Sequence, residues 1–402
     1  MRFIFLTLGY TPDIDGGGYR YATEVAELLA TRGHEVHAVF PNPGNRFPQQ
    51  ETRRGVALHR VPKVGGGFLS NFRAANRAAR GVVRGLLSTS TEPTLLFSHQ
   101  AYLSPALHRL PFVMVLQGPW GLEHRFARQA VARPWPRRML DELVCAAMTR
   151  IERRSVATAR RVFVASGYSR SKLPEWHPGL SPVTEVIGGG ADFSRFHPPA
   201  DRAAVRRERG LADDDILFLA VRRLDPRMGL GQLVDGFAQV PASSPRARLW
   251  IAGKGAQRDE LQRRIDAAGL RGRASLLGFV AEEELPRLYG AADCVIMPSL
   301  DLEGFGLATA ESLACGTPVI ASRAGANPEL VRPLGDGLLF EPGDVASLAT
   351  ALRDVLSGRL ALPSRDRCLE HARAEFRWDR PCDAIERAHA ASAVRGWPEG
   401  LP

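Results

Sequence analysis

The sequence predicts an α/β protein made of two doubly wound domains, and three patterns point to that fold. Short, continuous apolar runs alternate with helical stretches, as expected for parallel strands that are covered on both faces. The alternation stops near the middle of the chain and then begins again, which indicates two sheets rather than one. The length of 402 residues also exceeds what a single hydrophobic core usually supports.

The first domain is expected over residues 1–187. Its opening run, "RFIFLTLGY", is followed by the helical stretch "YATEVAELLATRG" and the strand-like "HEVHAVF". Further buried strands are expected at "GVALHRV", "TLLFSHQ", "PFVMVLQG" and "RVFVASG". The apolar start superficially resembles a signal peptide, but the run is too short and no small-residue cleavage site follows it. We therefore interpret it as a first strand that ends in a glycine turn.

The second domain is expected over residues 188–379, with strands at "DILFLAVRRL", "ARLWIAGKG", "RASLLGFV", "DCVIMPS" and "TPVIAS". The segment "VIGGGADFSRFHPP" (186–199) is rich in Gly and Pro and suits a hinge. The last helix, about 380–402, is expected to pack back onto the first domain. Open α/β sheets bind ligands at the carboxyl ends of their strands, so two such edges are expected to face each other across a cleft.

Composition and charge exclude several classes of protein. No apolar run reaches the roughly 18 to 20 residues that a bilayer span needs, and the five scattered cysteines lack the spacing of a disulfide framework or a zinc site. These features predict a cytoplasmic protein. The net charge is +10, and the Arg-rich segment 137–161 fits either a solvated helix face or a peripheral contact with acidic lipid. No nucleic-acid recognition motif accompanies this charge.

The most informative stretch is "EGFGLATAE", residues 303–311. Gly304 and Gly306 lack the Cβ atoms that would keep a ligand from the backbone, and a helix start next to them favours an anion such as a diphosphate. Glu303 and Glu311 would repel phosphate but accept hydrogen bonds from neutral hydroxyl groups. A nucleotide-sugar offers both kinds of group. Taken alone, the stretch also fits a capped helix with exposed glutamates.

The wider segment 277–331 resembles the C-terminal domain of glycosyltransferase family 4, whose members are retaining, nucleotide-sugar-dependent enzymes with the GT-B fold. The resemblance continues through "IAGKGAQRDEL" (251–261), which contains Lys254, the hinge, and "GGGYRYATEVAELLATRGHEV" (16–36). It implies that Glu303 contacts the donor sugar and that Glu311 binds the ribose. The other substrate-binding residues that it implies in this domain are Gly304, Phe305, Gly306 and Leu307 along the sugar and diphosphate, Phe279 and Val280 at the base, and Lys254.

The family also carries an Arg–Lys pair that neutralises the departing diphosphate. In "VRRLDPRMGL" (221–230), Arg223 matches the arginine, but Met228 stands where the lysine usually does. A thioether cannot replace an ammonium group, so Arg227 is expected as the substitute cation. The alternative is a surface run of arginines beside a degenerate site.

In the N-terminal half, Gly16 and Gly17 are expected to approach the diphosphate through main-chain N–H groups. The segment "LQGPWGLEHR" (116–125) resembles one that usually begins with histidine, and Gln117 stands in its place. No acid–base role carries over, although Gln117 can hydrogen-bond to a sugar hydroxyl. His99 is a further candidate for binding the substrate, with core packing as the alternative.

No metal is expected. The triplet "DID" (13–15) can bind a metal in another glycosyltransferase architecture, but here it lies in a loop without the fold pattern which that architecture requires. The sequence therefore predicts a retaining transfer of a hexose-type sugar, most simply from a UDP-sugar, to a hydroxyl or amine of a small molecule, lipid or glycan. The alternatives are a nucleotide-sugar epimerase of the same fold and a non-catalytic nucleotide-sugar-binding homologue.

Overall fold

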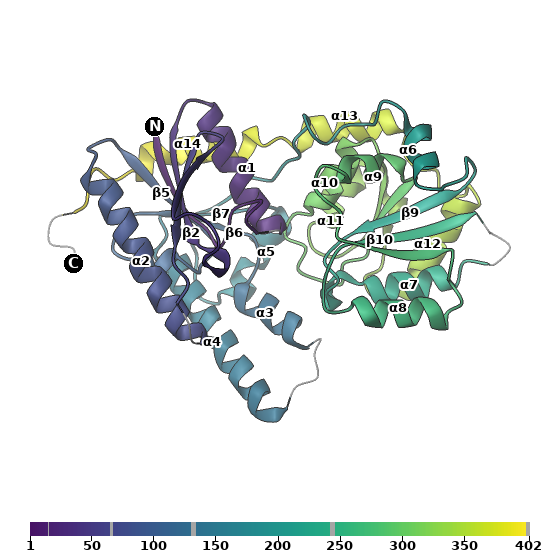
Figure 1. The fold of residues 1–402 in the computed structure, drawn as a ribbon, viewed down its shortest axis with the longest axis horizontal. Coiled ribbons are helices and arrows are strands. Elements are labelled where there is room, and N and C mark those ends of the chain that lie inside the picture. The colour runs from purple at the N-terminus through teal and green to yellow at the C-terminus, as the bar shows by residue number, and fades with distance from the viewer. Residues whose placement is uncertain (15, 65–66, 130–133, 242–245, 399–402) are drawn as a thin grey trace. The chain divides into compact units, whose positions relative to one another are not determined.

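A computed structural model describes residues 1–14, 16–64, 67–129, 134–241 and 246–398 of the chain. The chain forms two compact units (Figure 1). The N-terminal unit contains Met1–Arg125, Pro134–Gly189 and Trp378–Pro402, and the C-terminal unit contains Phe126–Arg133 and Gly190–Arg377. Each unit has a parallel sheet flanked by helices, which confirms the predicted fold class.

The N-terminal unit has a sheet of eight strands within the described residues, in the order β3-β4-β2-β1-β5-β6-β7-β8. The strands are β1 (Arg2–Leu6), β2 (Glu35–Pro41), β3 (Gln50–Arg53), β4 (Val56–Val61), β5 (Thr94–His99), β6 (Val113–Leu116), β7 (Arg161–Val164) and β8 (Thr184–Val186). Only the β3–β4 pair is antiparallel among those described. The sequence reading overlooked β3 because its residues are polar and only partly buried.

The helices along this half of the chain are α1 (Gly17–Thr31), α2 (Phe68–Ser88), α3 (Trp120–Gln129), α4 (Trp135–Thr158) and α5 (Gly167–Trp176), with 3-10 turns η1 (Pro43–Asn45) and η2 (Ser104–Leu107). The last helix, α14 (Asp379–Ser392), returns to this unit.

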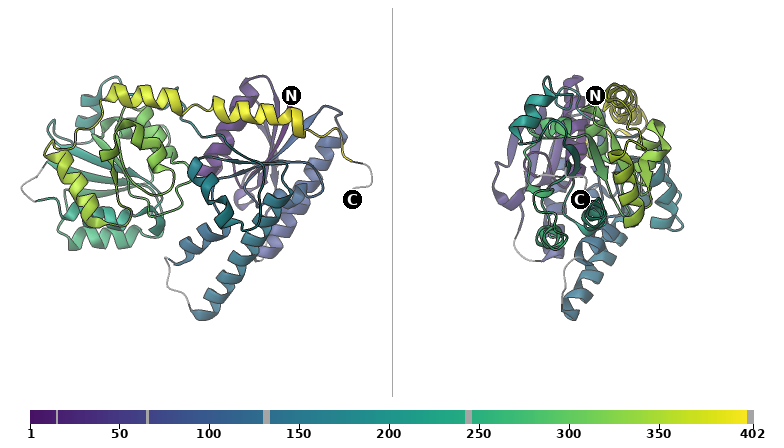
Figure 2. Two further views of the ribbon diagram at one scale, coloured as in Figure 1. Left: turned by 180° about the vertical axis from the view of Figure 1, so that it is seen from behind. Right: turned by 90° about the vertical axis from the view of Figure 1, so that its right-hand side faces the viewer.

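The contacts of α14 attach the chain's last helix to the first helix and to the sheet of the N-terminal unit (Figure 2). The guanidinium of Arg32 in α1 pairs with Asp379 at 2.8 Å, Asp383 at 2.7 Å and Glu386 at 3.0 Å. Just beyond α14, Val394 forms an antiparallel bridge with Thr94 at the start of β5. The unit is therefore built from two parts of the chain that are far apart in sequence.

The C-terminal unit has a six-stranded sheet within the described residues, in the order β11-β10-β9-β12-β13-β14, and the recorded pairs are all parallel. The strands are β9 (Ile216–Val221), β10 (Ala247–Ala252), β11 (Ala274–Gly278), β12 (Cys294–Met297), β13 (Val319–Ser322) and β14 (Leu339–Phe340). The helices are α6 (Arg202–Glu208), α7 (Leu230–Ala238), α8 (Arg258–Ala267), α9 (Leu285–Ala291), α10 (Leu307–Ala314), α11 (Asn327–Val331), α12 (Val345–Leu356) and α13 (Arg365–Glu375), with 3-10 turns η3 (Pro226–Met228), η4 (Arg332–Leu334) and η5 (Asp336–Leu338).

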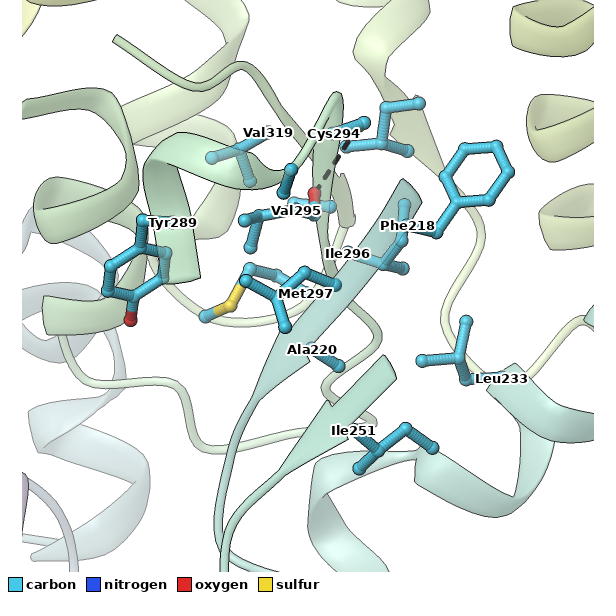
Figure 3. Close-up of a cluster of buried hydrophobic side chains, with 14 of the residues drawn as sticks. Phe218, Ala220, Leu233, Ile251, Tyr289, Cys294, Val295, Ile296, Met297 and Val319 are labelled. Atoms are coloured by element: carbon cyan, nitrogen blue, oxygen red, sulfur yellow. Dashed lines mark hydrogen bonds between the residues drawn. The ribbon is translucent and has the colours of Figure 1, made fainter. Parts of the chain in front are cut away.

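The core of the C-terminal unit explains why its strands read as continuous apolar runs. Val295, Ile296 and Met297 of β12 are fully buried, and they lie beside Ala220 of β9 and Ile251 of β10 (Figure 3). Helices cover both faces of the sheet, so every position of a central strand meets apolar neighbours. The central strands β9, β12 and β13 accordingly contain no charged residue.

None of the helices in the described ranges combines the length and the hydropathy that a membrane span would require.

Candidate functional site

The loops at the carboxyl ends of β9, β10 and β12 meet around Glu303, and glycines make this approach possible. A Cβ atom at Gly253, after β10, would lie 1.8 Å from the Arg222 carbonyl oxygen after β9. A Cβ atom at Gly325, after β13, would lie 2.6 Å from the Cβ of Glu303. No side chain fits at either position, so these glycines allow the loop backbones to touch.

Glu303 is held by an arginine and a serine. Its Oε2 accepts hydrogen bonds from Arg222 Nη2 at 2.5 Å and from Ser299 Oγ at 2.8 Å. The Arg222 and Glu303 side chains are only 6% and 12% exposed, so water screens this ion pair weakly. Burial raises the pKa of the Glu303 carboxyl, but the charges of Arg222 and Arg227 outweigh burial and leave the pKa below its ordinary value. Glu303 is therefore an ionised hydrogen-bond acceptor at neutral pH.

Arg222 is the residue that the sequence reading missed. Its Nη2 lies 2.6 Å from the sulfur of Met228, and its Nη1 lies 3.5 Å from the sulfur of Met297. The guanidinium thus occupies the space beside Met228, at the position where the family pattern has a lysine. The signal that could have located it is the pair of arginines directly after β9, because residues that follow one another at a strand end point to opposite sides.

The two arginines that the sequence favoured lie on the same loop as Arg222, and they differ in burial and contacts. Arg223 is exposed, and within the described part of the chain its side chain makes no ion pair or hydrogen bond. Arg227 is only 8% exposed, and its Nη1 donates to the carbonyl oxygen of Leu302 at 2.7 Å. This contact supports the left-handed turn at Leu302, whose φ is 54°, directly before Glu303. The expectation that Arg227 replaces the missing lysine stays a prediction.

The start of α10 is open. Gly306 precedes the helix with a φ of 99°, and no side chain caps the first turn. The Phe305 ring packs edge-on against Phe376 at 6.0 Å, which anchors the segment Gly304–Leu307 to the core. Such a helix start, rigid and without a side-chain cap, presents main-chain N–H groups to an anion.

Glu311 lies further along α10 and belongs to the interior. It is 4% exposed, and its Oε2 accepts a hydrogen bond from Tyr289 Oη at 3.0 Å. This contact fixes the carboxylate within the core of the C-terminal unit, so the ribose contact implied by the resemblance is a prediction that needs its own test.

Lys254 and Phe279 form a pair at the ends of β10 and β11. The Lys254 ammonium lies 3.7 Å from the centroid of the Phe279 ring, which is 49% exposed. The carbonyl oxygen of Lys254 accepts a hydrogen bond from the Leu224 amide at 2.9 Å, which connects this pair to the loop that carries Arg222. Val280 packs beside them against the core. An exposed aromatic ring next to a cation is a suitable platform for a nucleobase.

In the N-terminal unit, polar groups gather at the start of α1. Gly16 precedes the helix with a φ of 153° and no side-chain cap, and Gly17 is exposed. A Cβ atom at Gly18 would lie 2.9 Å from Gln117 Oε1 and 3.2 Å from Gln100 Nε2, so both glutamines lie against this first turn. Gln100, which the sequence reading did not select, has a left-handed φ of 68° that turns the chain directly after β5.

His99 is buried in the N-terminal unit, and its selection as a substrate-binding residue stays a prediction. It is 2% exposed, and its ring stacks on Tyr21 with centroids 5.8 Å apart. Burial lowers the pKa of His99 to about 3, so the imidazole is neutral. Among the described residues, neither ring nitrogen of His99 has a hydrogen-bond partner.

The acidic triplet after β1 has a structural role at its first residue. The Asp13 carboxylate accepts hydrogen bonds from Arg60 Nε at 2.6 Å and from Arg53 Nη1 at 3.0 Å. Asp15 lies outside the described residues. Two arginines thus occupy both oxygens of Asp13.

Comparisons with known proteins identify the family of this chain. Residues 15–195 match the family described as Glycosyltransferase Family 4, and residues 201–375 match the family described as Glycosyl transferases group 1. The chain is 38% identical over 253 residues to a D-inositol 3-phosphate glycosyltransferase of Geodermatophilus obscurus, and the match covers 60% of this chain and 55% of the relative. The chain thus spans about half the length of that relative.

Another relative matches over nearly its whole length. A GDP-mannose-dependent alpha-(1-6)-phosphatidylinositol monomannoside mannosyltransferase of Mycobacterium tuberculosis is 31% identical over 394 residues, 94% of this chain and 96% of the relative. Among solved structures, a sucrose-phosphate synthase from Thermosynechococcus elongatus has a TM-score of 0.80 at 22% identity and covers 97% of this chain and 98% of its own, which establishes the GT-B fold. Because a relative above 30% identity is matched almost from end to end and both halves match family profiles, this chain belongs to glycosyltransferase family 4.

Proposed function

We propose that this protein transfers a hexose from a nucleoside-diphosphate sugar to an acceptor hydroxyl group, with retention of the anomeric configuration. The observation that carries the proposal is the buried ion pair between Arg222 and Glu303. Glu303 lies a few residues before the uncapped start of α10. One carboxylate that is ionised and fixed in place suits the neutral hydroxyls of a sugar. A cation and a helix start suit the diphosphate.

The donor would be held mainly by the C-terminal unit. Glu303 would accept hydrogen bonds from the sugar, and the segment Gly304–Leu307 would line the diphosphate. The Lys254–Phe279 pair would stack on the base, and Glu311 would meet the ribose. In the N-terminal unit, Gln117, Gly16 and Gly17 would complete the donor and acceptor contacts.

When the anomeric C–O bond breaks, its electron pair passes to an oxygen of the leaving diphosphate. Arg222 and the start of α10 would stabilise this charge, because fixed cations and dipoles in a dry site need no reorganisation. Arg223, exposed and uncommitted, would add a second cation. This assignment accounts for the methionine at position 228: Arg222 supplies the charge that the family lysine supplies elsewhere.

Retention would follow from attack on the same face of the sugar. The acceptor oxygen bonds to the anomeric carbon as the leaving phosphate takes the acceptor proton. A double displacement would require a free carboxylate nucleophile. Glu303 is engaged by Arg222 and Ser299, which favours the same-face route.

The donor base and the acceptor remain to be chosen by experiment. The sequence favoured UDP-sugars, whereas the relative matched over 96% of its length is named for GDP-mannose. Both relatives named above act on inositol-containing acceptors by their names, D-inositol 3-phosphate and a phosphatidylinositol monomannoside. We therefore propose an inositol-containing acceptor, soluble or lipid-borne, reached from the cytoplasm by a peripheral membrane contact, with no metal cofactor.

The test combines UDP-glucose and GDP-mannose with inositol phosphate and with phosphatidylinositol, and measures nucleotide release. Acceptor-dependent release, with a product of retained configuration by NMR, is the expected result. Interconversion of the donor sugar without an acceptor would instead identify an epimerase. Donor binding without turnover would identify a non-catalytic homologue, the alternative that the methionine at position 228 would favour.

A further inference from the structure

The first turns of α4 carry large apolar side chains that nothing covers. Trp135 is 72% exposed, Met139 59%, Leu140 60% and Leu143 67%. Figure 1 and the rear view in Figure 2 show this end of α4 extending away from the sheet of the N-terminal unit. Scattered exposed leucines are ordinary on a protein surface, but four large side chains within three helical turns form a patch.

The four side chains share one side of the helix. At about 100° per residue, Trp135, Met139 and Leu143 follow one another in steps of about 40°, and Leu140 lies next to them. The buried residues of α4, Cys145, Met148, Glu152, Ser155 and Val156, lie on the opposite side, where the helix packs on its own unit. The apolar patch therefore faces solvent, because it lies on the side of α4 opposite to the buried residues.

The same side of α4 becomes basic further along the helix. Arg150 is seven residues beyond Leu143 and thus shifted by only about 20° around the helix. Arg150 and Arg154 are exposed, and within the described residues neither pairs with an acid. The acidic Glu142 is already paired with Arg125 at 2.9 Å. We call Trp135, Met139, Leu140, Leu143, Arg150 and Arg154 together the α4 surface.

We infer that the α4 surface docks this protein onto the surface of an anionic lipid bilayer. An apolar group followed by arginines matches the layers of such a bilayer: the apolar side chains enter the boundary of the acyl chains, and the guanidinium groups stay at the phosphates. The net charge of +10 adds a general attraction to the membrane.

A second copy of the chain is a poorer occupant. A twofold contact through the α4 surface would place Arg150 and Arg154 against the same arginines or against the apolar side chains of the other copy, and neither arrangement supplies an acidic partner. An anionic membrane supplies the missing negative charge and the missing apolar environment at once. The inference rests on the proposed function in one respect: docking would bring the enzyme to a lipid-borne acceptor.

The experiment is co-sedimentation of the full chain with phosphatidylcholine vesicles, with and without phosphatidylglycerol. Binding is expected only to the anionic vesicles and is expected to weaken at high salt. The double variant M139Q/L143Q should lower the partition coefficient at least tenfold. The variant R150Q/R154Q should lower it by about fivefold for each arginine removed.

Matched controls use exposed residues away from α4. V183Q replaces an exposed apolar residue before β8, and R207Q/R373Q removes two exposed arginines of the C-terminal unit. Both should bind vesicles like the wild type. Tryptophan emission should shift to the blue on binding and be quenched by lipid-borne bromine, and W135F should lose most of that response. Circular dichroism verifies that each variant is folded.

Failure of the wild type to bind anionic vesicles would overturn the inference, and so would α4 variants that bind as tightly as the controls. A concentration-dependent dimer that the α4 variants abolish would assign the surface to a second copy instead. Donor turnover with a soluble inositol phosphate is measured separately on the same variants and should not change. Loss of vesicle binding and loss of transfer are thereby distinguishable.

Discussion

Glu303 and Arg222 illustrate how much of this site depends on single side chains. Burying the Glu303 carboxylate, which is 12% exposed, without a partner would cost free energy, because a charge loses its hydration. The same cost applies to the Arg222 guanidinium, which lies beside two methionine sulfurs. Together they form an ion pair whose charge is already in place before a ligand arrives. Breaking such a pair by removing one partner typically destabilises a protein by about 3–5 kcal/mol.

Replacing Glu303 with glutamine should reduce turnover by orders of magnitude and leave nucleotide affinity nearly intact. The amide carries no negative charge, and its NH2 group donates where a carboxylate oxygen accepts, so the sugar loses its partner while the base and diphosphate keep theirs. The measurement is kcat by nucleotide release, with the Kd of the nucleoside diphosphate by calorimetry. E370Q, an exposed residue of α13, is the control, and loss of nucleotide binding by E303Q without a defect in the sugar step would contradict the assigned role.

Replacing Arg222 should cost more activity than replacing Arg223. We expect R222A to lower kcat/KM at least a hundredfold and R223A about tenfold or less, since Arg222 touches Glu303 and Arg223 does not. The double variant R222A/M228K should recover part of the lost activity, because a lysine at position 228 returns a cation to the same place. Equal effects of R222A and R223A would contradict the proposal that Arg222 supplies the charge of the family lysine.

The pH dependence follows from the lowered pKa of Glu303. A carboxyl whose pKa is lower when folded than when unfolded stabilises the fold above its unfolded value, near 4.5, and this stabilisation is lost as the pH falls through the folded pKa. Removing the positive charge of Arg222 raises the pKa of Glu303, so the acid limb of the activity profile should move to higher pH in R222A. An acid limb that stays in place would mean that another group controls it.

At the scale of elements, the site is a meeting of loops rather than a feature of any helix or strand. The loop after β9 carries Arg222, the loop after β12 carries Ser299 and Glu303, and the loop after β10 contacts the loop after β9. Parallel sheets place these loops at one edge because all strands end there. The positions of the individual side chains then depend on how closely the backbones approach.

G253A should therefore affect activity as well as stability. A Cβ atom there would meet the Arg222 carbonyl at 1.8 Å, so the loop carrying Arg222 must move. We expect a loss of stability above about 2 kcal/mol by urea unfolding and a fall in kcat/KM of at least a hundredfold. G210A is the control, since it has a left-handed φ of 72° but open space around it, and should lose only about 1 kcal/mol with normal kinetics.

At the scale of the whole molecule, the chain leaves the N-terminal unit at Gly189 and returns to it at Trp378. The C-terminal unit is almost continuous in sequence, while the N-terminal unit needs α14. Its contacts through Arg32, and the bridge between Thr94 and Val394, join residues 300 or more positions apart. The last segment, α14 with Val394, therefore stabilises the N-terminal unit, although almost the whole C-terminal unit separates the two along the chain.

Truncation after Trp378 should destabilise the N-terminal unit selectively. Loss of α14 uncovers part of the core beside Phe3, whose ring packs against His389. We expect a lower-temperature transition in calorimetry that the full chain lacks, with nucleotide binding by the C-terminal unit retained. Truncation after Pro398 keeps α14, the Val394 bridge and the Trp397 ring that packs on the core, and it should unfold like the full chain. A single unchanged transition in the shorter form would contradict this account.

The sequence by itself determined the two-sheet architecture, the family, and the segment that carries Glu303, because apolar runs and glycine spacing are local properties. Only the tertiary structure decided which arginine faces Glu303, that Arg227 supports a backbone turn, and that His99 is buried. The same holds for Gln100 at the start of α1 and the uncovered side of α4. Charge and residue type can be read along a chain. Which groups are buried together depends on how loops that are distant in sequence pack against each other. There, small differences in backbone direction decide which side chain points inward.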